Sequence, residues 1–272
     1  MIGIEEKLTA RDIALRSWRS LGAAFRVMPL LFIVTLSLGA AWCVAVVAIA
    51  ALKAAMTVPK FEDFSAQTLA VYSGAHVLDL LFWAALATPL AVAVHRFILL
   101  RQPRPRLLEV RHFFLWLAGL GLAFLAARAF CLLLSAVSFV RGLTEFTVTI
   151  GAVIVALQIG LIFPAIATGV PAASMEQRID SGFRMSEGRF LLLLRTIALT
   201  LIPLIILMVV LSRISGGPPP AKLAAGAPPA LPLPITPVRL VAAGALGAVQ
   251  AAALVLVAAT LSFLYAHQRK DT

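Results

Sequence analysis

Residues Leu86 to Leu117 read LATPLAVAVHRFILLRQPRPRLLEVRHFFLWL, in which an apolar run, a short basic stretch with two prolines and a second apolar run follow one another. The region holds one acid, Glu109, and five arginines: Arg96, Arg101, Arg104, Arg106 and Arg111. Loops rich in Lys and Arg are retained on the cytoplasmic side of a membrane. The stretch therefore predicts a cytoplasmic turn between two membrane-spanning helices, and this turn orients the rest of the chain.

The composition is that of a membrane protein. Of the 272 residues, 61% are hydrophobic and 13% are charged, with a mean hydropathy of +1.00. Soluble globular domains have an apolar share of about 45 to 50%. Outside the apolar segments no stretch is long enough to build a soluble core of its own. We therefore expect one membrane domain and no separate catalytic domain.

The net charge of +11 is explained by the membrane and does not indicate nucleic-acid binding. Most of the 23 Lys and Arg residues lie in short segments beside apolar runs, on the predicted cytoplasmic side, where an anionic leaflet attracts them. The expected partners are membrane lipids, anionic ones in particular, together with a possible membrane-protein partner.

Six apolar segments are long enough to cross a bilayer, which needs about 20 residues. The predicted fold is all-α, a polytopic protein with spans at about 29–52, 76–100, 112–140, 147–172, 190–211 and 238–266. Residues 141–145 are expected to form a tight outer turn, and the proline-rich segment 212–237 an outer loop. Segments 1–28 and 267–272 then lie in the cytoplasm of a bacterial cell, with the spans in its inner membrane. Three cycles of a basic segment and two spans are compatible with an internal repeat.

Two segments have the periodicity of amphipathic helices lying on the cytoplasmic leaflet. In segment 1–28 one arc is apolar and the other side is charged, although Arg11 intrudes on the apolar arc; the apolar residues are Ile4, Leu8, Leu15, Trp18, Leu21 and Phe25. In segment 174–189 the apolar face carries Met175, Ile179, Phe183 and Phe190, and the opposite face Glu176, Asp180, Arg184 and Glu187. A cleaved signal peptide is the alternative for the first segment, but the apolar run after it is too long for one.

Three polar residues fall at nearly the same depth inside predicted spans: Arg128, Gln158 and Gln250. If their helices are neighbours, they form one hydrogen-bonded layer, with Asp79 as the expected charged partner of Arg128. An intramembrane Arg indicates a functional site, here one for an anionic group. The alternative, which we favour, is that the layer joins helices and Arg128 extends toward the surface.

No catalytic or metal-binding constellation is present in the sequence. Cys43 and Cys131 lie in apolar segments and are expected to be buried without a disulfide. The four histidines, His76, His95, His112 and His267, all lie near span ends and are interpreted as headgroup contacts. We expect no catalytic residue, no metal and no cofactor.

Two passages carry a family resemblance: ALRSWRSLGAAFRVMPLL at Ala14 to Leu31, and PAIATG at Pro164 to Gly169 followed by SGFRMSEGRFLLLL at Ser181 to Leu194. They resemble the membrane domain fused to some bacterial glycerophosphodiester phosphodiesterases. In that family the chemistry belongs to a separate soluble barrel, for which this chain has no room. The resemblance implies a helical membrane domain concerned with lipids or with supporting a membrane partner.

The leading hypothesis for function is a non-catalytic inner-membrane protein that acts through lipid or partner-protein contacts. The five arginines around the predicted turn, Arg96 to Arg111, are the candidate headgroup contacts. The alternative is a small transporter or channel with a polar site around Arg128, Gln158 and Gln250. A lipid-modifying enzyme is third, because no acid, base or metal cluster supports it.

Overall fold

A computed structural model describes residues 9–49, 66–134, 138–170, 174–187, 190–216 and 235–268. Helices account for nearly all of these residues, and the described part of the chain contains no strand. The helices are α1 (Ala10–Val27), α2 (Pro29–Ala48), α4 (Ala66–Leu100), α5 (Leu107–Leu134), α6 (Ser138–Ile159), α7 (Ile162–Ala167), α8 (Met175–Ser186), α9 (Phe190–Gly216) and α10 (Pro237–Gln268).

Five of these helices contain a stretch that is long and apolar enough to cross a membrane. The stretches are Pro29–Ala48, Ala70–Leu100, Leu107–Phe130, Phe190–Ser215 and Pro237–His267. They correspond to the first, second, third, fifth and sixth predicted spans. The chain is therefore an all-helical membrane protein with five candidate spans among the residues that the structure describes.

The fourth predicted span, 147–172, is divided between two helices in the structure. Helix α6 begins at Ser138 and ends at Ile159, and α7 follows after a turn at Gly160 and Leu161. Pro164 lies one turn past this break and has no amide hydrogen to continue the ladder of α6. The apolar part of α6, Phe146–Ile159, is shorter than the five candidate spans.

The predicted outer turn at residues 141–145 was wrong, because these residues lie inside the first turns of α6. The connection before them, residues 135–137, lies outside the described part. Helix α9 continues to Gly216, into the segment predicted as a loop from 212 onward. The remainder of that loop up to residue 234, like residues 1–8, 50–65 and 269–272, is not described.

Helix α10 is the centre of the packing and contacts α1, α2, α4, α7 and α9. Its small residues Ala243, Gly247 and Ala251 follow one another at intervals of four and form a close-packing face. Ala243 and Ala251 are buried, and a Cβ on Gly247 would overlap the backbone carbonyl of Gly39 in α2. Glycine is needed here because the two backbones touch.

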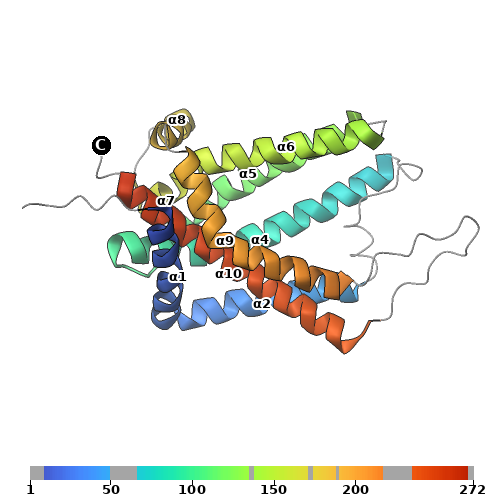
Figure 1. Cartoon of the computed structure of the whole chain (residues 1–272), viewed down its shortest axis with the longest axis horizontal. Coiled ribbons are helices and arrows are strands. Elements are labelled where there is room, and N and C mark those ends of the chain that lie inside the picture. The colour runs from blue at the N-terminus through green and yellow to red at the C-terminus, as the bar shows by residue number, and fades with distance from the viewer. Residues whose placement is uncertain are drawn as a thin grey trace, which may run out of the picture.

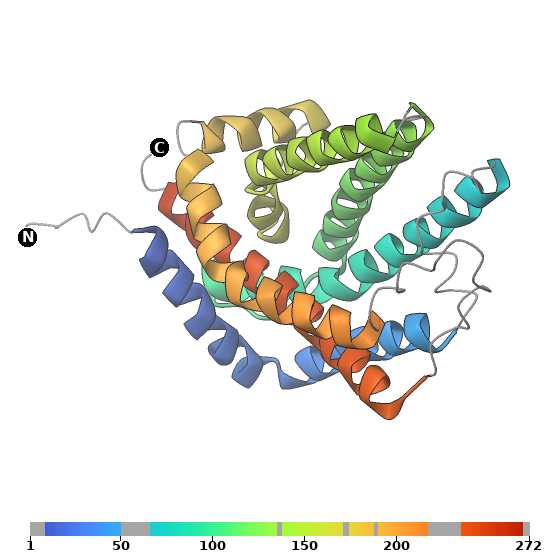
Figure 2. The same cartoon turned by 45° about the vertical axis from the view of Figure 1, so that its right-hand side comes forward.

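Successive long helices run in alternate directions between the two ends of the bundle (Figure 1). One end, to the left in Figure 1, holds α1, α7, α8, the turn between α4 and α5, and the C-terminal end of α10. The view in Figure 2 shows the same grouping, with the starts of α1 and α9 near the end of α10. We call this the α1/α8 end.

Candidate functional site

The basic turn connects α4 to α5 and consists of residues 101–106, with Arg111 one turn into α5. At the end of α4 the amide of Arg101 donates to the Phe97 carbonyl at 3.2 Å, and the amide of Gln102 to the Arg96 carbonyl at 3.3 Å. These bonds require a left-handed residue after the helix, and Arg101 takes that conformation with φ of 59°. Pro103 then prevents the helix from resuming.

Four of the five arginines predicted to contact headgroups are exposed: Arg101, Arg104, Arg106 and Arg111. Two apolar side chains beside them are exposed as well, Leu107 at 85% and Leu108 at 63%. Charged and apolar groups therefore lie side by side on the surface of the turn. A membrane interface accommodates such a mixture, since its outer part is polar and its inner part apolar.

The fifth arginine, Arg96, lies inside the protein, which corrects the expectation that it contacts headgroups. It is 2% exposed, and its Nη1 donates to Oε2 of Glu109 at 2.6 Å. Its Nη2 donates to Oε1 of Gln102 at 3.0 Å, and Nη1 also lies 3.4 Å from the carbonyl of Ala167. Burial of a guanidinium is tolerable only with such partners. Arg96 thus joins α4, the basic turn, α5 and α7.

The loop after α7 is shaped to fit this buried pair. Gly169 has φ of 75°, and its amide donates to the Ile166 carbonyl at 3.0 Å. A Cβ placed on Gly169 would lie 3.0 Å from Oε1 of Glu109. A residue without a side chain is therefore required here both by the backbone and by the space beside Glu109.

Helix α1 begins with a capping box, in which Thr9 accepts from the amide of Asp12 and Asp12 accepts from the amide of Thr9. The hydrogen bonds from the Thr9 side chain and backbone hold the pKa of Asp12 below its usual value. Asp12 lies at the positive N-terminal end of α1, where a carboxylate is also favourable.

A helix is present in the described part of segment 1–28, and besides the predicted apolar arc and charged side it has a third face that packs on the bundle. The face buried against α9 and α10 carries Ile13, Ser17 and Ala24, each 0% exposed. Leu15 and Phe25, which the periodicity placed on the apolar face, are 46% and 43% exposed. Helix α1 therefore has a face on the bundle, an exposed apolar side and an exposed charged side. Ile4 and Leu8 lie outside the described residues.

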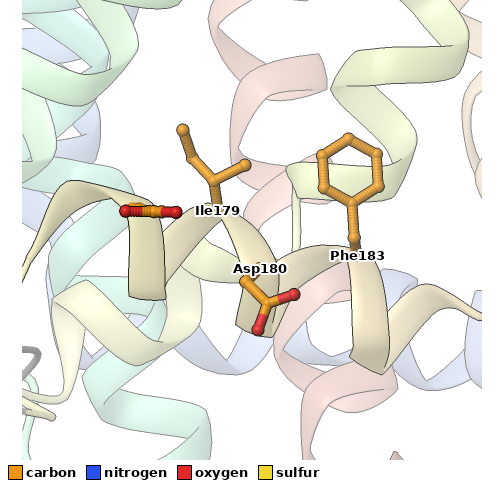
Figure 3. A pocket seen from close by; sticks show the side chains of 4 residues that line it. Ile179, Asp180 and Phe183 are labelled. Carbon is orange, nitrogen blue, oxygen red and sulfur yellow. The ribbon is translucent and has the colours of Figure 1, made fainter.

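Helix α8, the second predicted amphipathic helix, likewise has a face on the bundle, an exposed apolar side and an exposed charged side. Gly182 is buried, and a Cβ there would lie 2.8 Å from Ile162 of α7. Ile179 and Phe183 point the same way from the helix, and Asp180 points away from them (Figure 3). With Glu176 these residues line a shallow open groove of about 530 Å³. Asp180 pairs with the exposed Arg184 at 2.9 Å.

The predicted polar layer of Arg128, Gln158 and Gln250 does not form as a joined set among the described residues. Oε1 of Gln250 accepts from Sγ of Cys43 in α2 at 3.4 Å. The guanidinium of Arg128 lies 6.0 Å from the ring centroid of Tyr72 in α4, a cation–π distance. Gln158 is half-buried in α6.

Asp79, the predicted partner of Arg128, accepts instead from Nε1 of Trp42 in α2 at 2.7 Å. The side chains of Trp42 and Cys43 in α2 thus form hydrogen bonds to α4 and α10 respectively. This is the joining role that the alternative hypothesis gave to polar residues in the spans, carried by different pairs.

Two buried polar contacts were missed by the sequence reasoning. His95 is 1% exposed, so it is not at the surface as expected, and its Nδ1 lies 2.7 Å from Oγ of Ser262 in α10. Oγ1 of Thr260 lies 3.1 Å from Oγ of Ser17 and 3.5 Å from Oγ1 of Thr200. The contacts of Thr260 thus join α1, α9 and α10. The sequence indicates them only through Ser17, a polar residue on the same helical face as Ile13 and Ala24.

Within the described ranges, no three His, Cys, Asp or Glu side chains lie close enough to hold a metal ion. The side chain of Cys131 lies outside those ranges, and Cys43 is a free thiol. The surface chemistry of the α1/α8 end is instead that of guanidinium groups beside apolar side chains, which suits phosphate oxygens and hydrocarbon.

Comparison with family models, with curated proteins and with solved structures found no significant match to this chain.

Proposed function

We propose that this protein is a non-catalytic protein of a bacterial cytoplasmic membrane that acts by binding anionic lipids at the α1/α8 end of its bundle. The observation that carries the proposal is the exposure of Arg101, Arg104, Arg106 and Arg111 at the junction of two candidate spans. Juxtamembrane clusters of Lys and Arg attract an anionic leaflet by about 1 kcal/mol for each residue near the surface.

The proposed orientation places the α1/α8 end in the cytoplasm, and with it both chain termini. Support comes from the positive-inside rule, because this end also holds the exposed Arg16, Arg19 and Arg26 of α1. The exposed arginine at the other end of α9 is Arg213.

In this proposal α1 and α8 lie in the headgroup region. Each has one face packed on the bundle and exposed apolar and charged sides, and an interfacial helix needs both of these exposed sides. Leu15 and Phe25 of α1 and Phe183 of α8 would reach the acyl boundary. Arg19 and Arg184 would remain among the headgroups.

A sixth crossing is proposed for α6 together with α7. Helix α6 has 22 residues, which at about 1.5 Å per residue gives roughly 33 Å, close to the thickness of a bilayer core. The break before α7 occurs where Leu161, Ile162 and Pro164 are buried in protein. Non-helical backbone at membrane depth is tolerated in such surroundings.

The proposal agrees with what the resemblance to the phosphodiesterase membrane domain implies, a helical domain that handles lipids or supports a membrane partner. The alternative of a transporter or channel predicts a hydrated site at Arg128. It gains no support from the geometry, because Arg128 lies against Tyr72 and Gln250 pairs with Cys43.

The test is native mass spectrometry of the protein released from nanodiscs with equal amounts of phosphatidylglycerol and phosphatidylcholine. We expect enrichment of phosphatidylglycerol among the retained lipids. The variant with Arg101, Arg104, Arg106 and Arg111 all changed to Gln should lose most of it. The single variants Arg104→Gln and Arg213→Gln form a matched pair, of which the first alone should reduce the enrichment. Equal retention of both lipids by the unmodified protein would refute the proposal.

A further inference from the structure

A second basic site lies away from the basic turn, in a groove between the start of α1 and the first half of α9. The groove has a volume of about 490 Å³ and is lined by Thr9, Ala10, Arg11, Arg195, Ala198 and Leu199. Each helix contributes one arginine. Helix α1 contacts α9 along the bundle, and both helices begin at the α1/α8 end (Figure 2).

Both guanidinium groups of the groove belong to exposed residues. Among the described residues neither Arg11 nor Arg195 forms a salt bridge. The nearest acid in sequence, Asp12, accepts from the amide of Thr9 at 3.0 Å and lies close enough to Arg11 for an electrostatic interaction, but it forms no ion pair with Arg11. Two positive charges therefore border one groove, and a phosphate with its several acceptor oxygens matches the donors of two arginines.

An apolar strip continues from the groove along α9. Leu199, Ile202 and Ile206 follow Arg195 at helical spacings of four, three and four residues, so the four side chains share one side of the helix. Leu199 is 50% exposed, Ile202 49% and Ile206 60%. The charged groove is thus the end of a lipid-facing strip, with Arg195 at the end nearer the start of α9.

We propose that this groove is a specific site for a membrane phospholipid, whose phosphate lies between Arg11 and Arg195 and whose acyl chain follows Leu199, Ile202 and Ile206. The inference rests on the proposed function, since it requires that the α1/α8 end lies at a phospholipid leaflet. It goes further in assigning one defined lipid position. A lipid bound here touches both α1 and α9, and so strengthens the attachment that Ser17, Thr200 and Thr260 also make.

The test is titration of the full chain in detergent with dioleoylphosphatidylglycerol, with binding followed by native mass spectrometry. The double variant Arg11→Gln with Arg195→Gln should weaken the tightest lipid by about tenfold or more, because two charge-assisted contacts are lost. The control is Arg213→Gln, which removes an exposed arginine of α9 outside the groove, at the opposite end of the same helix. It should change binding of that lipid by less than about twofold.

A second variant keeps both charges. Ala198→Trp fills the groove and should weaken the same lipid, while leaving the elution of the protein on size exclusion unchanged. Glycerol phosphate at millimolar concentration should not displace the lipid, because it lacks the chain that contacts α9. Displacement by glycerol phosphate would show a site for a free phosphate group and overturn the assignment to a lipid.

The outcomes also separate this site from the proposed function. If the tight lipid survives in both groove variants but is lost when the four arginines of the basic turn are changed to Gln, the groove is not the site and the proposed function stands. If the unmodified protein retains no phosphatidylglycerol, both proposals fail. Loss in the groove variants alone supports the site.

Discussion

Nη1 of Arg96 lies 2.6 Å from Oε2 of Glu109, and the two residues are 2% and 6% exposed. This pair closes the turn between α4 and α5 and, through the Ala167 carbonyl, attaches the turn to α7. The other four arginines of this region, Arg101, Arg104, Arg106 and Arg111, remain exposed on the surface. The exposed basic surface therefore depends on a buried ion pair beneath it.

Removing one partner of this pair should destabilise the protein strongly. Arg96→Met leaves the Glu109 carboxylate buried and unpaired, and we expect a loss of about 3 to 5 kcal/mol in the free energy of unfolding. Arg96→Met combined with Glu109→Leu should lose much less than the sum of the single changes, because no buried charge remains. Denaturant titration in detergent micelles measures this. Additive losses would show that the two residues do not stabilise each other.

Gly169→Ala should also be destabilising, by about 1 to 2 kcal/mol, because the residue has a left-handed backbone and a Cβ would approach Glu109. Gly119→Ala in α5 is the matched control, since a Cβ there meets nothing within 4 Å. That control should be neutral or stabilising by about 0.5 to 1 kcal/mol. The melting temperature should therefore fall in Gly169→Ala and stay level or rise in Gly119→Ala, and a similar fall in both variants would contradict this explanation.

The close approach of α2 and α10 at Gly247 should make this position sensitive to a larger side chain. Gly247→Ala forces the two backbones apart, and we expect a loss of about 1 to 3 kcal/mol. Gly244, one turn earlier on α10, has its nearest neighbour at 3.6 Å, so Gly244→Ala should be tolerated. The free energies of unfolding of the two variants decide the point. Equal stability would mean that the helices do not approach at Gly247.

The capping box of α1 should make its first turn sensitive to acid. The pKa of Asp12 is lowered in the folded protein from the usual value of 3.8. The cap therefore stabilises α1 at pH values above 3.8, and this stabilisation is lost as the pH falls through the lower pKa of the folded state. Hydrogen exchange of the first amides of α1 should accelerate when pH falls below about 4, after correction for the intrinsic rate. Asp12→Asn should weaken this pH dependence. An unchanged dependence in that variant would assign it to another group.

The sequence was sufficient for the parts of the fold that depend on composition. Long apolar runs predicted five helices that the structure contains, because a bilayer-length helix needs little more than continuous apolar residues. The amphipathic periodicity of segments 1–28 and 174–189 predicted α1 and α8. The break between α6 and α7 was missed because Gly160 and Pro164 lie in a run that is apolar throughout, and a proline within a span does not by itself end it.

Side-chain partners could not be predicted in the same way. Arg96 was counted with the four exposed arginines because charge alone does not distinguish a guanidinium that faces solvent from one that folds back on an acid 13 residues later. That distinction depends on the left-handed turn at Arg101. Asp79 was assigned to Arg128 by charge, whereas it bonds to the indole of Trp42. The sequence gives the depth of each polar residue within its span. It does not give the rotation of each helix about its own axis, which determines which side chains meet.

The most direct test of lipid binding at the α1/α8 end is a density map of the protein in nanodiscs that contain phosphatidylglycerol and phosphatidylcholine. We expect headgroup density at the α1/α8 end, beside Arg101, Arg104, Arg106 and Arg111, with a further phosphate between Arg11 and Arg195. Density for headgroups only at the opposite end, or an α1/α8 end standing in water away from the bilayer surface, would contradict it.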